Sequence, residues 1–263
     1  MSWKFWKKTD ARRLERRLIG EGLFRTKNFS FVSSASVFTL ETTDETIALL
    51  KGPAMLDLYE KYLPEKVERI FEIGFFQGGM PLFLADTLSP EKVVAIDYKL
   101  PSAALMRHVE RAGLENRVKF FGRTMQDDGA TLRKILEEEF GDSPLDVITD
   151  DCSHEYGYTK ASFEACFGYL RPGGKFILED WGWAHWPGDE WQSDSSYFHG
   201  RAALTNLLFE LLMVHASDPD IVAKIEVVSP AFAVITRGKG LRHKEKLSLR
   251  AVYKTAGRNF SVL

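Results

Sequence analysis

The feature that most constrains this fold is a regular alternation of short apolar runs with longer helix-like segments, starting at Arg69. Five runs have the length and composition of buried strands, at residues 70–73, 93–96, 118–121, 145–148 and 175–178. The segments between them are 80–88, 103–112, 130–140 and 159–170. Because connections of this length permit right-handed crossovers between parallel strands, the rhythm predicts a doubly wound α/β fold.

The pattern changes after the fifth run. A helix is expected near residues 202–215, and two β-rich stretches, 224–228 and 231–236, follow with only Ser229 and Pro230 between them. This spacing predicts an antiparallel hairpin at the C-terminal end of the core. We therefore expect a mostly parallel, seven-stranded sheet.

The N-terminal region has a different texture. Residues 1–25 combine tryptophans with an arginine block in which Leu14 and Leu18 recur at helical spacing, so we predict a short amphipathic helix. Such a helix more often packs against its own domain, or against a partner subunit in a homo-oligomer, than on a membrane surface. A capping pattern at Thr43 predicts a second helix that ends near Pro64.

These patterns divide the chain into three regions. We expect an N-terminal helical extension over 1–64, a core over 65–238 and a basic tail over 239–263.

Composition excludes several classes of protein. A formal net charge of -2 provides no basic field for nucleic acid, and no apolar run approaches the roughly 18 residues that a membrane span needs. The two cysteines, Cys152 and Cys166, lack metal-binding or disulfide-framework spacing, which favours a reducing, cytoplasmic location.

A glycine-rich turn follows the first strand of the core. Glu72 lies within this strand and Gly74 and Gly78 lie in the turn, where missing Cβ atoms allow a ligand to approach the backbone. Since the Glu72 carboxylate would repel a pyrophosphate, a cationic nucleoside such as S-adenosylmethionine suits the turn better than a dinucleotide. Asp97 ends the second strand, where its carboxylate is placed to accept both ribose hydroxyls.

Two further acidic residues are candidates for the cofactor site. Asp127 follows the third strand, where the adenine amino group would lie, and a helix-capping role is an equal alternative. Asp150 ends the fourth strand and is expected near the sulfonium, or else to cap backbone groups.

Three carboxylates end two strands that we expect to be neighbours. Asp151 follows the fourth strand, and Glu179 and Asp180 end the fifth. Because these carboxylates would repel one another, a hard divalent cation such as Mg²⁺ is the simplest resolution. Such an ion would lower the pKa of a substrate hydroxyl, and His154 is placed to accept its proton as a general base.

The motif at residues 150–154 (DDCSH), followed by 170–174 (LRPGG) and 177–180 (ILED), resembles the macrolide-sugar O-methyltransferases of the macrocin and mycinamicin type and the cephalosporin-hydroxylase-like proteins grouped with them. The resemblance covers about residues 69–185 and implies a class I methyltransferase that uses S-adenosylmethionine. It also implies that Asp151, Glu179 and Asp180 hold magnesium and that His154 is the base. Cys152 replaces a glycine of the motif, and Met80 stands where a serine is common; neither change removes a ligand.

A stretch with four tryptophans, residues 181–191, leaves the same edge of the predicted sheet. It is either a lid whose rings stack on the acceptor, or a hydrophobic plug or subunit contact. The whole pattern predicts metal-dependent methyl transfer to a hydroxyl of a small natural-product-like acceptor, a sugar or other diol. A catechol-like acceptor, an NAD-dependent dehydrogenase and a noncatalytic binding module are the alternatives.

Overall fold

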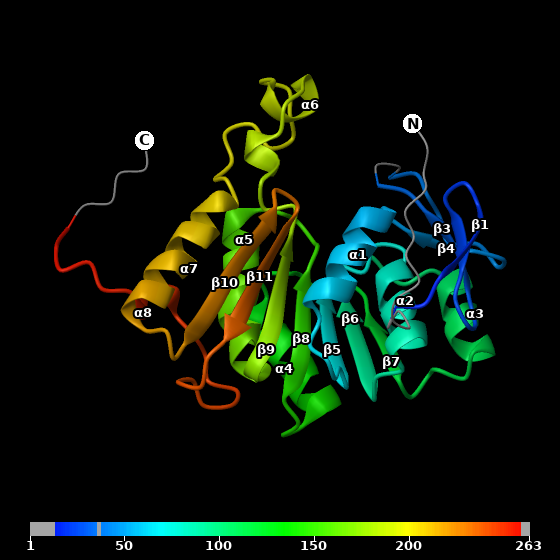
Figure 1. Ribbon diagram of the computed structural model, residues 1–263, viewed down its shortest axis with the longest axis horizontal. Helices are drawn as coiled ribbons and strands as arrows, with labels where there is room; N and C mark the ends of the chain where they lie inside the picture. Colours follow the sequence, from blue (N-terminus) through cyan, green and yellow to red (C-terminus); the bar gives the residue numbers. More distant parts are fainter. Residues whose placement is uncertain (1–13, 36–37, 259–263) are drawn as a thin grey trace.

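The computed structural model describes residues 14–35 and 38–258 and is built around a seven-stranded sheet (Figure 1). The strand order is β10-β11-β9-β8-β5-β6-β7, in which β11 alone runs antiparallel to both of its neighbours. The strands are β5 (Arg69–Ile73), β6 (Lys92–Ile96), β7 (Val118–Phe121), β8 (Leu145–Asp150), β9 (Leu170–Glu179), β10 (Val222–Ser229) and β11 (Phe232–Arg237). The expected mostly parallel sheet with a terminal hairpin is therefore confirmed.

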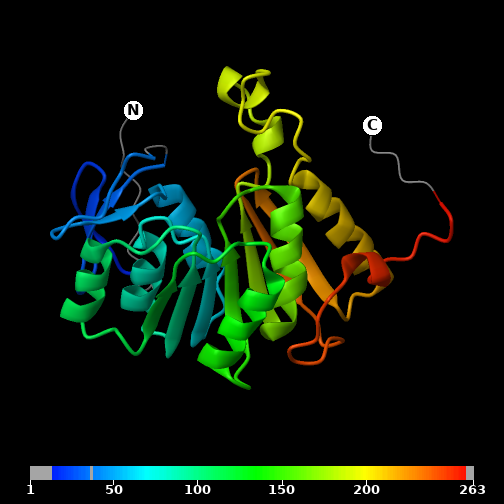
Figure 2. The same ribbon diagram turned by 180° about the vertical axis from the view of Figure 1, so that it is seen from behind.

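Helices cover both faces of this sheet (Figures 1 and 2). Adjacent strand residues point to opposite faces, so Ile70 joins the core under α1, α2 and α3, whereas Phe71 joins the core under α4, α5 and α7. The helices are α1 (Pro53–Tyr62), α2 (Gly79–Leu88), α3 (Ala103–Arg111), α4 (Gly129–Phe140), α5 (Tyr156–Cys166) and α7 (Thr205–Ser217). Burial on both faces explains why the strands appear in the sequence as continuous apolar runs.

The N-terminal addition is mainly β-structure, so the predicted helical extension is wrong there. A second sheet has the order β1-β2-β3-β4, formed by β1 (Arg17–Gly20), β2 (Leu23–Arg25), β3 (Ser30–Ser33) and β4 (Ile47–Leu49). Leu14 is buried but Leu18 is 67% exposed, so the spacing that suggested a helix does not mark a shared face. The first 13 residues of the predicted amphipathic helix lie outside the described residues.

The second predicted helix begins later than expected. The segment after Thr43 enters β4, which pairs in parallel with β3, and α1 starts only at Pro53, a residue suited to the first helical turn. β4 also lies tightly against α2, since a Cβ added to Gly79 would be 2.2 Å from the Ala48 carbonyl oxygen. This close approach fixes the N-terminal addition beside the glycine-rich turn.

Short elements complete the chain. They are η1 (Phe167–Tyr169), η2 (Trp183–His185), α6 (Asp189–Gln192) and α8 (Leu249–Val252). The segment with η2 and α6 projects beyond the carboxyl edge of the sheet (Figure 1). Leu247 and Leu249 of the predicted basic tail are buried in the α4–α5 core, so this part of the tail packs on the domain. Within the described residues, no helix has both the length and the apolarity for a membrane span.

Candidate active site

Acidic side chains converge at the carboxyl edge of the sheet, as expected from parallel pairing of β8 with β5 and β9. Asp151, His154 and Asp180 each offer a ligand atom, and these atoms lie within 4.8 Å of one another. Asp151 Oδ1 is 3.7 Å from His154 Nε2. His154 and Asp180 have φ values of 56° and 47°, so both non-glycine residues adopt the left-handed backbone conformation. Two carboxylates and an imidazole form a donor set that fits a divalent cation.

The third predicted ligand, Glu179, is present but differently engaged. Its Oε1 and Oε2 accept hydrogen bonds from Lys51 Nζ at 2.7 and 2.8 Å, and Oε1 also accepts one from the Tyr59 hydroxyl. Lys51 Nζ further donates to Asp151 Oδ2 at 2.6 Å. Lys51, Tyr59 and Glu179 are all buried. The ammonium group therefore bridges two of the three carboxylates that the sequence pointed to.

These interactions set the charges of the acidic cluster, which consists of Asp151, Glu179 and Asp180. Burial lowers the pKa of Lys51, but Asp151 and Glu179 outweigh it, so the pKa lies well above its ordinary value and the side chain is a cation. Burial raises the pKa of Asp151, yet Lys51 and His154 together hold it below its ordinary value. Burial and Asp151 raise the pKa of Glu179, opposed by Lys51. The cluster thus has a permanent positive charge inside it.

Sequence reasoning missed Lys51 and Tyr59. Lys51 follows β4 and Tyr59 lies on α1, both in the N-terminal addition. The expected continuous helix gave no reason to place either side chain at the sheet edge. A lysine directly after the apolar run 47–50 was the available signal, because a charge that adjoins a buried strand needs a partner.

Glu72 presents a buried carboxylate oxygen with which a cationic ligand could pair. It is 2% exposed, and its Oε2 has no hydrogen-bond partner among the described residues. Burial raises its pKa well above the ordinary value, Lys51 opposes the rise and Asp151 adds to it. Because a buried carboxylate oxygen without a partner is costly, a ligand ammonium fits this position.

Gly74 and Gly78, the two glycines predicted for the cofactor turn, allow other parts of the chain to pack closely against the turn. Gly74 has φ 91°, and a Cβ there would lie 2.3 Å from the Asp151 carbonyl oxygen. Gly78 has φ 80°, and its Cβ would collide with Leu105. The turn therefore lies directly against the segment that carries Asp151, so the two candidate sites adjoin.

Asp97 links the turn to the next loop. Its Oδ2 accepts from the Phe76 backbone N–H at 2.8 Å, and its Oδ1 from that of Lys99 at 2.9 Å. Each carboxylate oxygen keeps a further lone pair. The proposed contact with ribose hydroxyls stays a prediction.

Asp150 is a buried hydrogen-bonding centre beneath the site. It accepts from Gln126 Nε2 at 2.8 Å and from Ser162 Oγ at 2.7 Å. Burial raises its pKa to about 6, opposed by these hydrogen bonds. Gln126 also accepts from Ser153, so it ties the end of β7 to the motif at 150–154. The expected proximity of Asp150 to a sulfonium stays a prediction.

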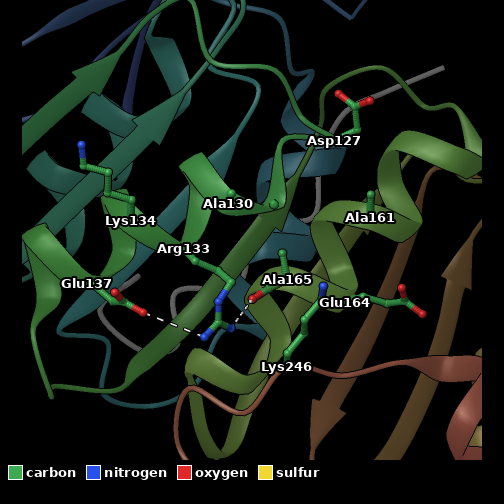
Figure 3. Close-up of a pocket in the computed structure, with 10 residues that line it drawn as sticks. Asp127, Ala130, Arg133, Lys134, Glu137, Ala161, Glu164, Ala165 and Lys246 are labelled. Carbon is green, nitrogen blue, oxygen red and sulfur yellow. Dashed lines mark hydrogen bonds and ion pairs between the residues drawn. The ribbon is translucent and has the colours of Figure 1, made fainter.

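Asp127 is exposed and lies in a different hollow of about 570 Å³ between α4 and α5 (Figure 3). Arg133 and Lys246 line the same hollow, and none of its lining residues belongs to the acidic cluster. The neighbouring Asp128 provides the helix cap, accepting from the Thr131 backbone N–H. This geometry gives no support to a contact between Asp127 and adenine, which stays a prediction.

The rings of the tryptophan-rich loop pack on Phe198, on one another and against the core. Trp183 stacks on Phe198 with ring centroids 4.0 Å apart, and Trp191 stacks on the same ring at 5.9 Å. Trp186 meets Trp191 edge to face.

Cys152 is half-buried, and burial raises the pKa of its thiol, in keeping with an inert role.

The seven-stranded, mostly parallel sheet with helices on both faces matches the class I methyltransferase fold. Residues 71–181 match the model of a family described as a methyltransferase domain. This central region, less than half of the chain, is therefore similar to a methyltransferase domain.

Two similar proteins indicate which kind of methyltransferase this chain resembles. L-olivosyl-oleandolide 3-O-methyltransferase of Streptomyces antibioticus is 32% identical over 115 residues, which cover 43% of this chain and 29% of that protein. Demethylmacrocin O-methyltransferase of Streptomyces fradiae is 41% identical over 64 residues, covering 24% of this chain and 15% of that one. The resemblance to O-methyltransferases of this type is confirmed, over less than a third of these relatives' length.

One solved structure supports the fold. The MycE methyltransferase of the mycinamycin biosynthetic pathway, in complex with Mg, SAH and mycinamycin VI, superposes with a TM-score of 0.52 at 24% identity. The match covers 71% of this chain and 49% of the MycE chain. It confirms the class I methyltransferase fold.

Proposed function

We propose that this chain catalyses methyl transfer from S-adenosylmethionine to a hydroxyl group of a small natural-product-like acceptor, a sugar or other diol, with the aid of a divalent metal such as Mg²⁺. The observation that carries the proposal is the cluster of Asp151, His154 and Asp180 beside buried Glu72, at the carboxyl edge of a methyltransferase sheet. The two relatives described above are both named O-methyltransferases, which supports the reaction class.

Two residues would bind the cofactor. Glu72 Oε2 is positioned to accept from an ammonium group, since this buried oxygen has no other hydrogen bond among the described residues. Asp97 keeps acceptor capacity for ribose hydroxyls at the neighbouring strand end. S-adenosylmethionine supplies the electrophilic methyl group when it is bound. Its two positive charges match this acidic surface.

The metal would be held by Asp151 and Asp180. Oxygen donors of this kind suit Mg²⁺ and Mn²⁺, and both side chains are partly exposed, so substrate oxygens can reach the same point. A bound divalent ion supplies positive charge that lowers the pKa of an adjacent hydroxyl. The MycE complex contains both Mg and SAH, which supports the use of a metal together with this cofactor.

His154 would act as the general base. The imidazole is partly exposed, and Nε2 is 3.7 Å from Asp151 Oδ1, close to where the hydroxyl must lie. Its nitrogen would accept the hydroxyl proton while the oxygen forms its bond to the methyl carbon and the bond from that carbon to the sulfonium sulfur breaks, with S-adenosylhomocysteine as the leaving group. Asp151 stabilises the resulting imidazolium electrostatically.

A methyl-transfer assay tests this function. The purified protein would be incubated with radiolabelled S-adenosylmethionine and either glycosylated macrolides or catechols, with EDTA and then with added Mg²⁺. We expect label only in hydroxylated glycosides, lost with EDTA and restored by Mg²⁺. Labelled catechols would establish the alternative acceptor, and activity that is insensitive to EDTA would contradict the metal's role.

A further inference from the structure

We propose that Lys51 keeps Glu179 out of the metal's ligand shell, so that Asp151 and Asp180 hold the ion while the lysine serves as a second, tethered cation. This inference rests on the metal-dependent function proposed above. It changes the ligand set expected from the sequence, in which Glu179 is one of three ligands.

The contacts of Glu179 are the first reason. Both of its oxygens accept hydrogen bonds from the Lys51 ammonium, at 2.7 and 2.8 Å, and one also accepts from Tyr59. The carboxylate is 2% exposed. An ion at coordination distance from either oxygen would have to displace the ammonium, because two cations at such short range repel strongly.

The contacts of Asp151 and Asp180 are the second reason. Lys51 contacts Asp151 through Oδ2 only, and Oδ1 is directed toward the imidazole of His154 at 3.7 Å. The Asp180 carboxylate makes no hydrogen bond within the part of the chain that the structure describes. These two side chains therefore have oxygens that are free to coordinate.

Charge balance shows why Lys51 accompanies the metal and does not replace it. The electrostatic partners of Lys51 and Glu179 include Glu72, Asp151 and Asp180, so four carboxylates surround one ammonium. When these carboxylates are ionised, one divalent ion and the ammonium of the cofactor would compensate negative charge that Lys51 alone leaves unpaired. Since buried charges require compensation, Lys51 alone is insufficient.

The arrangement has a measurable consequence for metal affinity. The Lys51 ammonium repels the ion and withholds a ligand, so the site binds metal more weakly than three free carboxylates would. The N-terminal addition thereby adjusts the site, since Lys51 and Tyr59 both come from it. Removing the ammonium alone should release Glu179 and strengthen binding.

The decisive experiment measures Mn²⁺ affinity by electron paramagnetic resonance on the full chain. The key variant is the double replacement Lys51→Met with Glu179→Gln, which conserves net charge and removes both members of the Lys51–Glu179 ion pair. We expect its Mn²⁺ affinity to stay within about threefold of wild type, whereas the matched control Asp180→Asn loses about tenfold or more. Lys51→Met alone should gain about tenfold.

The possible results distinguish failure of this inference about Glu179 from failure of the proposed metal-dependent function. If the double variant loses as much affinity as Asp180→Asn, while melting like wild type, Glu179 is a ligand and the inference is overturned. Unchanged or weaker binding by a folded Lys51→Met variant also overturns it. If wild type itself fails to bind Mn²⁺, the metal-dependent function fails and the inference fails with it.

Discussion

The indole Nε1 of Trp183 donates a hydrogen bond of 2.7 Å to the backbone carbonyl of His154. The bond joins the loop after β9 to the loop after β8, and thus links the two segments that supply the acidic cluster. His154 has a left-handed backbone, a conformation that non-glycine residues keep only when their surroundings enforce it. Trp183 is buried and stacked on Phe198, so it is a rigid support for the proposed base.

Trp183→Phe should therefore lower kcat by about tenfold, because the ring stacking is kept while the bond that orients His154 is lost. Affinity for S-adenosylhomocysteine should not change. Trp191→Phe is the matched control, since the Trp191 indole bonds only to the adjacent Glu190 within the described residues. Equal effects of the two replacements on kcat would count against a positioning role for Trp183.

His154→Ala should lower kcat by roughly 10²- to 10⁴-fold, the usual contribution of a general base. Titrations should show that Mn²⁺ and S-adenosylhomocysteine still bind with wild-type affinity. Single-turnover assays of the same preparation would measure the loss of turnover. Retained turnover would remove His154 as the base. Lost Mn²⁺ binding would make it a metal ligand.

Glu72→Gln should weaken S-adenosylhomocysteine binding by about tenfold or more, because a charge-assisted hydrogen bond to its ammonium is lost. Binding of 5′-methylthioadenosine, which has no ammonium group, is the control and should be much less affected. Calorimetric titration of both ligands checks this. Equal losses for both ligands would place the defect in the fold of the turn.

Stability should fall on acidification through His243. Burial lowers its pKa, with help from Lys244, and neither ring nitrogen has a hydrogen-bond partner among the described residues. Below the ordinary pKa of 6.5, the unfolded chain therefore binds more protons at this histidine than the folded chain does. The contribution of neutral His243 to the free energy of unfolding is thus present above that pH and is lost as the pH falls through the folded-state pKa. His243→Phe should flatten the melting temperature between pH 7.5 and about 5.5; an unchanged slope would refute the assignment.

The sequence predicted the sheet well because its signals are local. Each strand is a short apolar run and each crossover has its own helical pattern, so β5 to β9 were expected within a few residues. Parallel pairing then required Asp151, Glu179 and Asp180 to meet at one edge. The placement of the cluster follows from topology.

What the sequence could not predict depends on long-range contacts. Lys51 pairs with Glu179 across 128 positions of the chain, and nothing near Lys51 announces that partner. The β-structure of residues 17–33 is stabilised by rings such as Phe24 and Phe31 packing on Phe83 of α2, an arrangement that overrides the apparent helical spacing. Asp127 followed a strand as expected, but the turn exposes it in another hollow.

The proposed function requires that the carboxyl edge of this sheet bind S-adenosylmethionine and a divalent metal. Its most direct test is calorimetric titration of the full chain with S-adenosylhomocysteine, with and without Mg²⁺, with NAD as the comparison. We expect micromolar binding of S-adenosylhomocysteine and no binding of NAD. Binding of NAD, or of neither ligand, would contradict it and favour a dehydrogenase or a noncatalytic binding module.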